Sequence, residues 1–257
     1  MSGLKTIRRR IVSVRNTKQI TRAMKLVSAA KLRRAQDAAV NGRAFVQHLS
    51  RIMSTILGDL PADFSHPLLE QRSTVRSRCI VVIAGERGLC GAYNSNVTKA
   101  VLAELAQKSA DGGAIETDVI ALGRRSVSSG RRLGWTVVQA YEGLAEDASR
   151  WPASAIAAHV IDGFTTKRYD EVVLIYTEFV SAMSQRVARE TLLPLSARAL
   201  SGTAEVSGTP GLTKYSPGPV ATFDLLLAML INSKLLQAGM ESQASEHAER
   251  LSAMDAA

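Results

Sequence analysis

The sequence has few of the residues that build disulfide scaffolds, metal centres or membrane spans. Only two of its 257 residues are cysteine and four are histidine. Cys79 and Cys90 belong to no Cys-x-x-Cys or Cys/His pair, so we expect reduced thiols rather than a metal or redox site. No uninterrupted apolar run of about 18 residues occurs either, so no segment is expected to span a bilayer by itself.

Signatures of catalysis and phosphate binding are missing as well. The histidines are scattered, with no His-Glu-x-x-His, no paired carboxylates stand out, and no Gly-x4-Gly-Lys-[Ser/Thr] loop occurs. The segment GERGLCGAYN, residues 85–94, follows an apolar run, but a dinucleotide turn needs a second glycine where Arg87 stands. We therefore expect a tight strand-to-helix turn, and no catalytic residue, cofactor site or metal site.

Acidic and aromatic residues are absent from the N-terminal segment. The first 36 residues contain eleven Lys or Arg and no Asp or Glu, and the first aromatic residue is Phe45. The whole chain has 32 basic and 23 acidic residues, so outside this segment the charge nearly balances. Arginines at 8, 9, 10 and 15 interrupt the apolar positions, so the segment is no secretory signal, and a mitochondrial presequence would be much shorter. The pattern indicates a cytosolic chain.

The concentrated positive charge has several interpretations. A charge run is often only a solvated helix face, whereas clustered Lys and Arg can also bind nucleic-acid phosphates. The lack of aromatic residues weakens base stacking and also anchoring at a membrane surface. An acidic protein partner is the remaining interpretation.

Both ends of the chain have helical periodicity. Apolar residues recur at helical spacing from Leu4 until Gly58 and Pro61 end the pattern, which predicts a helix of ~80 Å that projects from any compact domain. The early heptad spacing, if continued, puts polar residues on the seam near the middle, so a uniform self-associating coiled coil is not expected. Residues 220–257 also read as one helix, of net charge −3. The two helices, one basic and one acidic, are expected to form an antiparallel coiled coil.

The middle of the sequence changes period. Short apolar, β-branched runs at 79–85, 118–123, 136–141 and 171–179 alternate with helical stretches at 95–109, 124–133 and 148–164. This alternation predicts a Rossmann-like α/β domain with a mostly parallel sheet. Residues 184–193 are a candidate further strand, and 201–219 read as a loop or linker. The expected organisation is a helix at 1–58, an α/β domain at 72–213 and a helix at 220–257.

Three stretches resemble one known family. Residues 4–36 resemble the N-terminal helix of the gamma subunit of F-type ATP synthases, including the pattern T-x-x-I-T-x-A-M-x-x-V-[AS]-[AS]-x-K-x-R-x-A on Thr17–Ala35. Residues 85–94 resemble that family's turn after the first strand, and Glu241–Ala257 resemble its C-terminal helix. The three stretches occur in order and cover both ends and the middle.

The resemblance implies a rotor without chemistry of its own. In this family the terminal helices form a shaft inside a ring of alpha and beta subunits, and the α/β domain lies near the epsilon subunit and the membrane ring of c subunits. Proton flow turns the shaft, which changes the three catalytic sites in turn. The chain would then be a peripheral protein at the cytoplasmic face of the bacterial inner membrane, associated with the membrane only through the complex.

The resemblance also implies which residues contact partners. Met24 and Lys25 would approach an acidic loop of a beta subunit, with Arg250 on the facing helix, although Met24 also suits coiled-coil packing. Screened contacts of a basic shaft with acidic loops would let it turn. The expected contact residues are Arg8, Arg9, Arg10, Lys18, Met24, Lys25 and Arg250.

Two departures and two rival functions accompany the resemblance. Family members continue past the stretch resembling Leu251–Ala257, so the C-terminal helix is expected to be incomplete. The middle lacks the chloroplast-type cysteine insertion, which favours a bacterial enzyme. The rivals are a nucleic-acid-binding helix on an α/β domain, and a nucleotide-dependent oxidoreductase built on the turn at 85–91.

Overall fold

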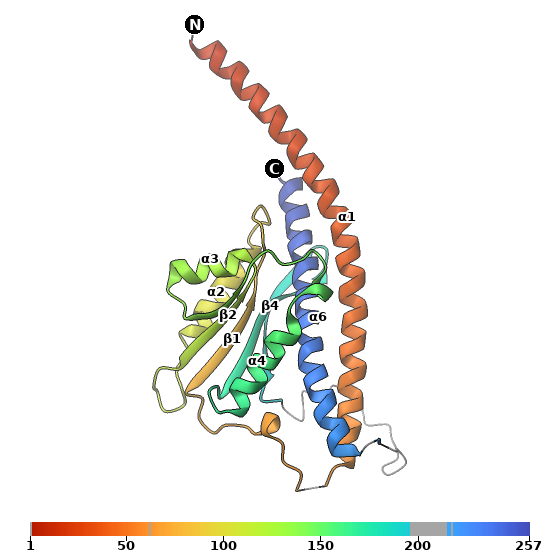
Figure 1. Ribbon diagram of the computed structural model, residues 1–257. Helices are drawn as coiled ribbons and strands as arrows, with labels where there is room; N and C mark the ends of the chain where they lie inside the picture. Colours follow the sequence, from red (N-terminus) through yellow and green to blue (C-terminus); the bar gives the residue numbers. More distant parts are fainter. Residues whose placement is uncertain (1, 62, 196–214, 217) are drawn as a thin grey trace.

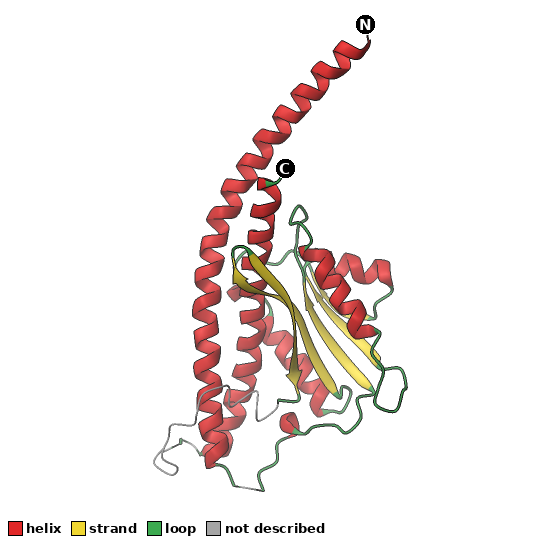
Figure 2. Ribbon diagram, turned by 180° about the vertical axis from the view of Figure 1, so that it is seen from behind, coloured by secondary structure: helices red, strands yellow, loops and turns green. Residues whose placement is uncertain are grey.

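Two long helices dominate the molecule. The computed structural model describes residues 2–61, 63–195, 215–216 and 218–257. Helices α1 (Ser2–Asp59) and α6 (Pro219–Asp255) lie side by side and antiparallel, with an α/β body against one side of the pair (Figure 1). The N-terminal end of α1 projects well past the C-terminal end of α6 (Figures 1 and 2). The predicted fold class, an antiparallel helix pair with a Rossmann-like α/β domain, is confirmed.

The body is built on a five-stranded sheet in the order β3-β2-β1-β4-β5. The first four strands are parallel and β5 is antiparallel to β4. The strands are β1 (Ser77–Ile83), β2 (Glu116–Leu122), β3 (Val137–Tyr141), β4 (Glu171–Ser181) and β5 (Ser184–Leu193). The helices are α2 (Tyr93–Leu105), α3 (Arg124–Leu133) and α4 (Ala153–Thr165), with short 3-10 turns η1 (Pro67–Leu69) and η2 (Ala148–Arg150).

The central strands are apolar on both faces because both faces are covered. Ile80 and Val82 of β1 point to a core shared with α2 and α3. Cys79, Val81 and Ile83 point the other way, to a core formed with α4, α6 and the C-terminal half of α1. The apolar runs that form β1, β2 and β4 are therefore largely buried strands, whereas β3, at the edge of the sheet, is only partly buried.

Some predicted boundaries were wrong. The helix predicted at 148–164 begins at Ala153, because Pro152 lacks an amide hydrogen and is tolerated only where a helix starts; residues 148–150 form a 3-10 turn instead. The helix predicted at 95–109 runs from Tyr93 to Leu105, and the chain then turns through a bridge between Lys108 and Ala114. The loop predicted at 201–219 lies mostly outside the described residues, which include only 215, 216, 218 and 219 of it. Pro219 begins α6.

Helix α6 is part of the core of the α/β body as well as half of the helix pair. Its buried residues Phe223, Leu227 and Leu230 share a core with the sheet and with Met53 of α1. By length and mean hydropathy alone, α6 could cross a membrane. Its packing against α1, α4 and β4 instead accounts for its apolar side chains. The sequence pattern alone did not indicate this packing on the sheet.

The seam between α1 and α6 becomes polar toward the top of the pair, as its heptad register predicted. Ser28 is buried, and Lys25 lies beside the last turn of α6. Lower down, Gly42 lets the helices approach, because a Cβ atom there would lie 2.2 Å from Gln237 Oε1 and 3.0 Å from Met240 Sδ. This glycine in a helix interior is explained by close packing.

Candidate functional site: the shaft and its junction with the α/β body

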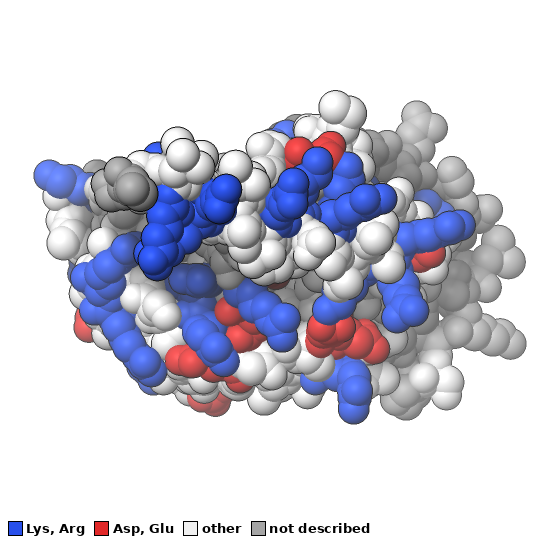
Figure 3. Space-filling model, turned by 90° about the horizontal axis from the view of Figure 1, so that it is seen from above, with Lys and Arg blue, Asp and Glu red and all other residues white. Residues whose placement is uncertain are grey.

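The free end of α1 is exposed and basic. Arg8, Arg9, Arg10 and Lys18 are all exposed, and among the described residues none of them has an ion-pair partner. Apolar residues alternate with them and are exposed too, from 48% for Ile11 to 67% for Val14. Figure 3, which looks down on this end, shows a surface with many more basic than acidic side chains. The free end thus combines cations with an uncovered apolar stripe.

Met24 and Lys25 lie where α6 ends. The Lys25 ammonium forms an ion pair with the Asp255 carboxylate, and the two side chains are 42% and 66% exposed. Met24 is partly buried and lines a cleft beside α6. An exposed pair of this kind contributes little to stability, so Lys25 remains accessible to another carboxylate.

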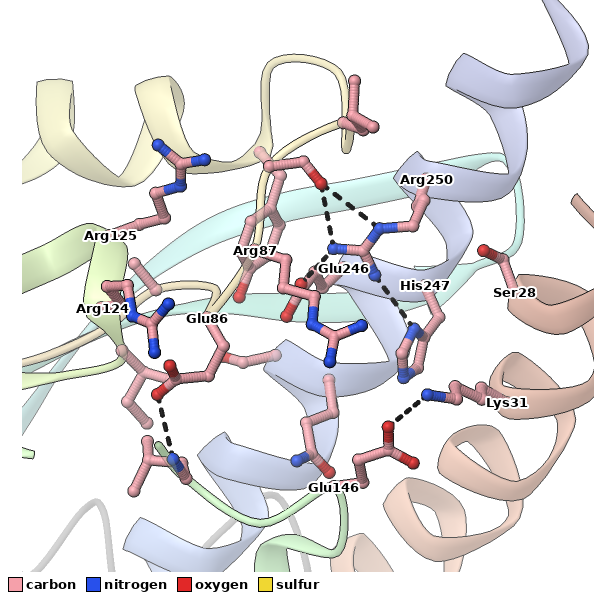
Figure 4. Close-up of a pocket in the computed structure, with 18 of the residues that line it drawn as sticks. Ser28, Lys31, Glu86, Arg87, Arg124, Arg125, Glu146, Glu246, His247 and Arg250 are labelled. Atoms are coloured by element: carbon pink, nitrogen blue, oxygen red, sulfur yellow. Dashed lines mark hydrogen bonds and ion pairs between the residues drawn. The ribbon is translucent and has the colours of Figure 1, made fainter. Parts of the chain in front are cut away.

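Arg250 occupies a different environment from the other predicted contact residues. Its side chain is only 9% exposed, and its guanidinium is paired with Glu246 one turn away. Its Nε and Nη2 atoms donate to the Gly88 carbonyl oxygen at 3.4 and 3.3 Å (Figure 4). Arg250 therefore joins α6 to the turn after β1, and its contact with a partner subunit stays a prediction.

His247 completes this internal cluster. Arg250 Nη1 lies 3.3 Å from His247 Nδ1. Burial, with the positive charge of Arg250, lowers the pKa of His247 to about 4. The imidazole is therefore neutral at pH 7 and its Nδ1 can accept the hydrogen bond from Arg250.

Acidic side chains of α6 cover the glycine-rich turn. A Cβ atom on Gly85 would lie 3.0 Å from the Glu246 carboxyl carbon, and one on Gly91 would lie 2.8 Å from Glu249 Oε2. In a dinucleotide-binding fold the corresponding turn approaches a pyrophosphate. Here two carboxylates occupy that space and would repel a phosphate, so the geometry gives no support to the oxidoreductase alternative.

A cleft of about 880 Å³ lies beside this turn, between the α/β body and the helix pair. It lies at the carboxyl ends of β1, β2 and β3. Charged side chains line it from both the α/β body and the helix pair of α1 and α6, which we call the shaft (Figure 4). Lys31 of α1 forms an ion pair across it with Glu146, and this interaction lowers the pKa of Glu146. Glu86 Oε1 accepts a hydrogen bond of 3.0 Å from the Leu144 amide. The cleft is thus bridged by contacts within the chain.

The two thiols are buried, and no metal-holding group is found among the described residues. Cys79 and Cys90 are free and buried, and burial raises the pKa of Cys79 to about 12 and also raises that of Cys90. No group of three His, Cys, Asp or Glu side chains in this part of the chain is placed to hold a metal ion.

Comparison with known proteins identifies the family. A family model described as ATP synthase matches residues 3–257. The ATP synthase gamma chain of Heliobacterium modesticaldum is 35% identical over 260 residues, covering 100% of this chain and 87% of the relative. That of Geobacter sp. strain M21 is 38% identical over 257 residues, covering 100% of this chain and 86% of the relative.

Solved structures with the same fold come from ATP synthase stalks. One chain in the structure of the Tetrahymena thermophila mitochondrial ATP synthase central stalk and c ring matches with a TM-score of 0.65 at 24% identity. The match covers 92% of this chain and 98% of that chain. The rotor of the Euglena gracilis mitochondrial enzyme matches at 0.63 and 18% identity, covering 99% and 90%. The comparisons give no support to the nucleic-acid alternative. The chain belongs to the ATP synthase gamma chain family.

Proposed function

We propose that this chain is a non-catalytic rotor whose basic free end turns inside a ring of alpha and beta subunits. The observation that carries the proposal is the row of exposed cations on the N-terminal part of α1, which have no ion-pair partner among the described residues. The other end of α1 packs against α6, and its Met53 and Ile56 belong to the core that α6 shares with the sheet. One end of a single helix is thereby free to enter a ring while the other is held by the body.

The charges of the free end suit a contact that forms and breaks during rotation. Arg8, Arg9, Arg10 and Lys18 are solvated, so their attraction to acidic loops of beta subunits would be screened within about 10 Å at ordinary ionic strength. Exposed ion pairs contribute about 0–1 kcal/mol each. Such contacts attract the shaft to the surrounding loops but are too weak to fix its angle. Met24 and Lys25 would meet the same loops at the base of the ring, with Arg250 behind them.

The α/β body is proposed to be the end of the chain that contacts the membrane-side subunits. The epsilon subunit and the ring of c subunits would contact the α/β body, opposite the free end of α1. Membrane association would then come only through the complex, at the cytoplasmic face of the bacterial inner membrane.

Rotation of the assembled complex tests this function. A bead is attached through Ser128→Cys, an exposed position on α3, while native Cys79 and Cys90 are buried. Reconstituted with its alpha and beta subunits, the chain should rotate the bead in one direction during ATP hydrolysis, and the isolated chain should hydrolyse no ATP. ATP hydrolysis by an assembled complex whose bead stays still would contradict the rotor function, and hydrolysis by the isolated chain would contradict the non-catalytic role.

A further inference from the structure

Strand β4 extends beyond its neighbour on one side. Its pairing with β1 ends at Ile175, opposite Val82, whereas its pairing with β5 continues to Ser181. Backbone groups of Thr177 and Phe179 on the β1 side therefore have no strand to pair with. Unpaired backbone groups in a buried position are costly, so other partners are needed there.

Side chains of the two long helices supply those partners. Ser242 Oγ accepts from the Thr177 amide at 3.3 Å, and Ser245 Oγ donates to the Thr177 carbonyl at 3.2 Å. Glu241 Oε2 accepts from the Phe179 amide at 3.3 Å, and Arg43 Nη2 donates to the Phe179 carbonyl at 3.1 Å. Helices α1 and α6 thus take the place of a missing strand along this part of β4.

Glu241 is the centre of this arrangement. Its carboxylate is buried and accepts two hydrogen bonds from Arg43, at 3.1 and 3.0 Å, and one from Gln237 at 2.6 Å. Gln237 also donates to the Ala39 carbonyl at 2.9 Å. One carboxylate therefore connects α1, α6 and β4, and because it is buried its interactions are little screened by salt.

We propose that Arg43 and Glu241, with Ser242 and Ser245, form the junction that transmits torque between the shaft and the α/β body. The inference rests on the proposed rotor function. Apolar packing between α1, α6 and the sheet is not directional and resists separation more than sliding or twisting. Hydrogen bonds depend steeply on angle, and those to a charged group are the strongest. This junction fixes the angle of the helix pair relative to the sheet.

A second ion pair between α1 and the body differs in having an exposed carboxylate and, among the described residues, no bond to the β4 backbone. Lys31 and Glu146 also join α1 to the body, but their side chains are 32% and 70% exposed. Arg43 and Glu241 are 41% and 4% exposed, and both also bond to the β4 backbone. Because Glu241 is buried and Glu146 is exposed, we call Arg43 and Glu241 the buried pair and use Lys31 and Glu146 as its matched control.

Angular fluctuations of a stalled rotor measure the stiffness of this junction. With a bead on Ser128→Cys and the ring fixed without ATP, the double variant Arg43→Met/Glu241→Leu is compared with Lys31→Met/Glu146→Leu. Arg43 and Glu241 make two of the four bonds to the β4 backbone, so the angular variance should rise about two-fold, with little change in the control. Replacing a buried ion pair by apolar side chains preserves many folds. Thermal unfolding of each isolated chain checks that the fold is kept.

The outcomes separate the junction from the rotor function. If the unmodified chain rotates the bead and the buried-pair variant fluctuates no more than the control, the junction is wrong while the rotor function stands. If the unmodified chain does not rotate, the rotor function itself fails. Should the buried-pair variant not assemble, Ser242→Ala/Ser245→Ala removes the other two bonds to β4. A wider variance than in the control then supports the junction, and an equal one overturns it.

Discussion

Lys25 of α1 and Asp255 of α6 form an ion pair where the second helix of the pair ends. Beyond this pair α1 continues alone, and below it the helices are held together and to the body by buried contacts.

A cation at Met24 should impair coupling. Met24 lies beside Lys25 and lines the same cleft as Arg250 and Lys31. Met24→Lys adds a positive charge there and should strengthen attraction to an acidic beta loop by ~0.2–1 kcal/mol. Fewer ATP molecules should then be made per proton passed, measured in membrane vesicles. Met24→Leu, which keeps an apolar side chain, should be close to normal. An unchanged ratio in Met24→Lys would show that residue 24 does not face such a loop.

Removing Arg250 should destabilise the isolated chain. Arg250→Ala leaves Glu246 without its cation and breaks both hydrogen bonds to the Gly88 carbonyl. Breaking a buried pair in this way costs about 3–5 kcal/mol. Urea unfolding measures the loss. Arg131→Ala, which removes a 75% exposed partner of Glu142, is the control and should change little. Equal effects of the two variants would mean that Arg250 is not a structural tether.

Gly91 is needed for two separate reasons. Its φ angle is +52°, and a Cβ atom would lie 2.8 Å from Glu249 Oε2. Gly91→Ala should cost about 1–2 kcal/mol for the left-handed backbone alone, with the clash in addition. At Gly112 the φ angle is +81° and nothing lies within 4 Å, so Gly112→Ala measures the backbone effect by itself. The free energy of unfolding should fall more for Gly91→Ala than for Gly112→Ala, and adding Glu249→Ala to Gly91→Ala should restore this extra loss. No recovery would mean that α6 does not press on this turn.

The sequence predicted local structure better than the contacts between distant segments. Apolar β-branched runs identified β1, β2, β3 and β4, and helical periodicity identified α1 and α6, because these signals are local. Arg43 and Glu241 are 198 positions apart and meet only once α6 lies on the sheet. A charged residue on a terminal helix is normally solvated, so nothing in the local sequence indicates that Glu241 is buried.

Small residues inside the helices were the signal that could have indicated this packing. Gly42 of α1 makes room for Gln237, and a Cβ atom on Gly239 of α6 would lie 2.8 Å from the Trp151 ring. Glycine costs about 1 kcal/mol in a helix interior relative to alanine. Two such residues opposite bulky partners favour close contact on more than one side of the pair. The family resemblance implied Arg250 as a partner contact, whereas the structure buries its side chain and joins it to the Gly88 carbonyl oxygen on the turn after β1.

The stability of the chain should depend on pH through His247. Burial and Arg250 lower the pKa of this imidazole from 6.5 to about 4 in the folded chain. Between these values the unfolded chain binds more protons than the folded one, so the free energy of unfolding falls as pH falls from about 6.5 to about 4. The contribution lost is on the order of 3 kcal/mol. His247→Gln keeps an acceptor for Arg250 but cannot titrate, so it should lack this part of the loss, as measured by urea unfolding at pH 7, 5.5 and 4. Parallel pH profiles for the two chains would mean that the imidazole is protonated in the folded state as readily as in the unfolded one.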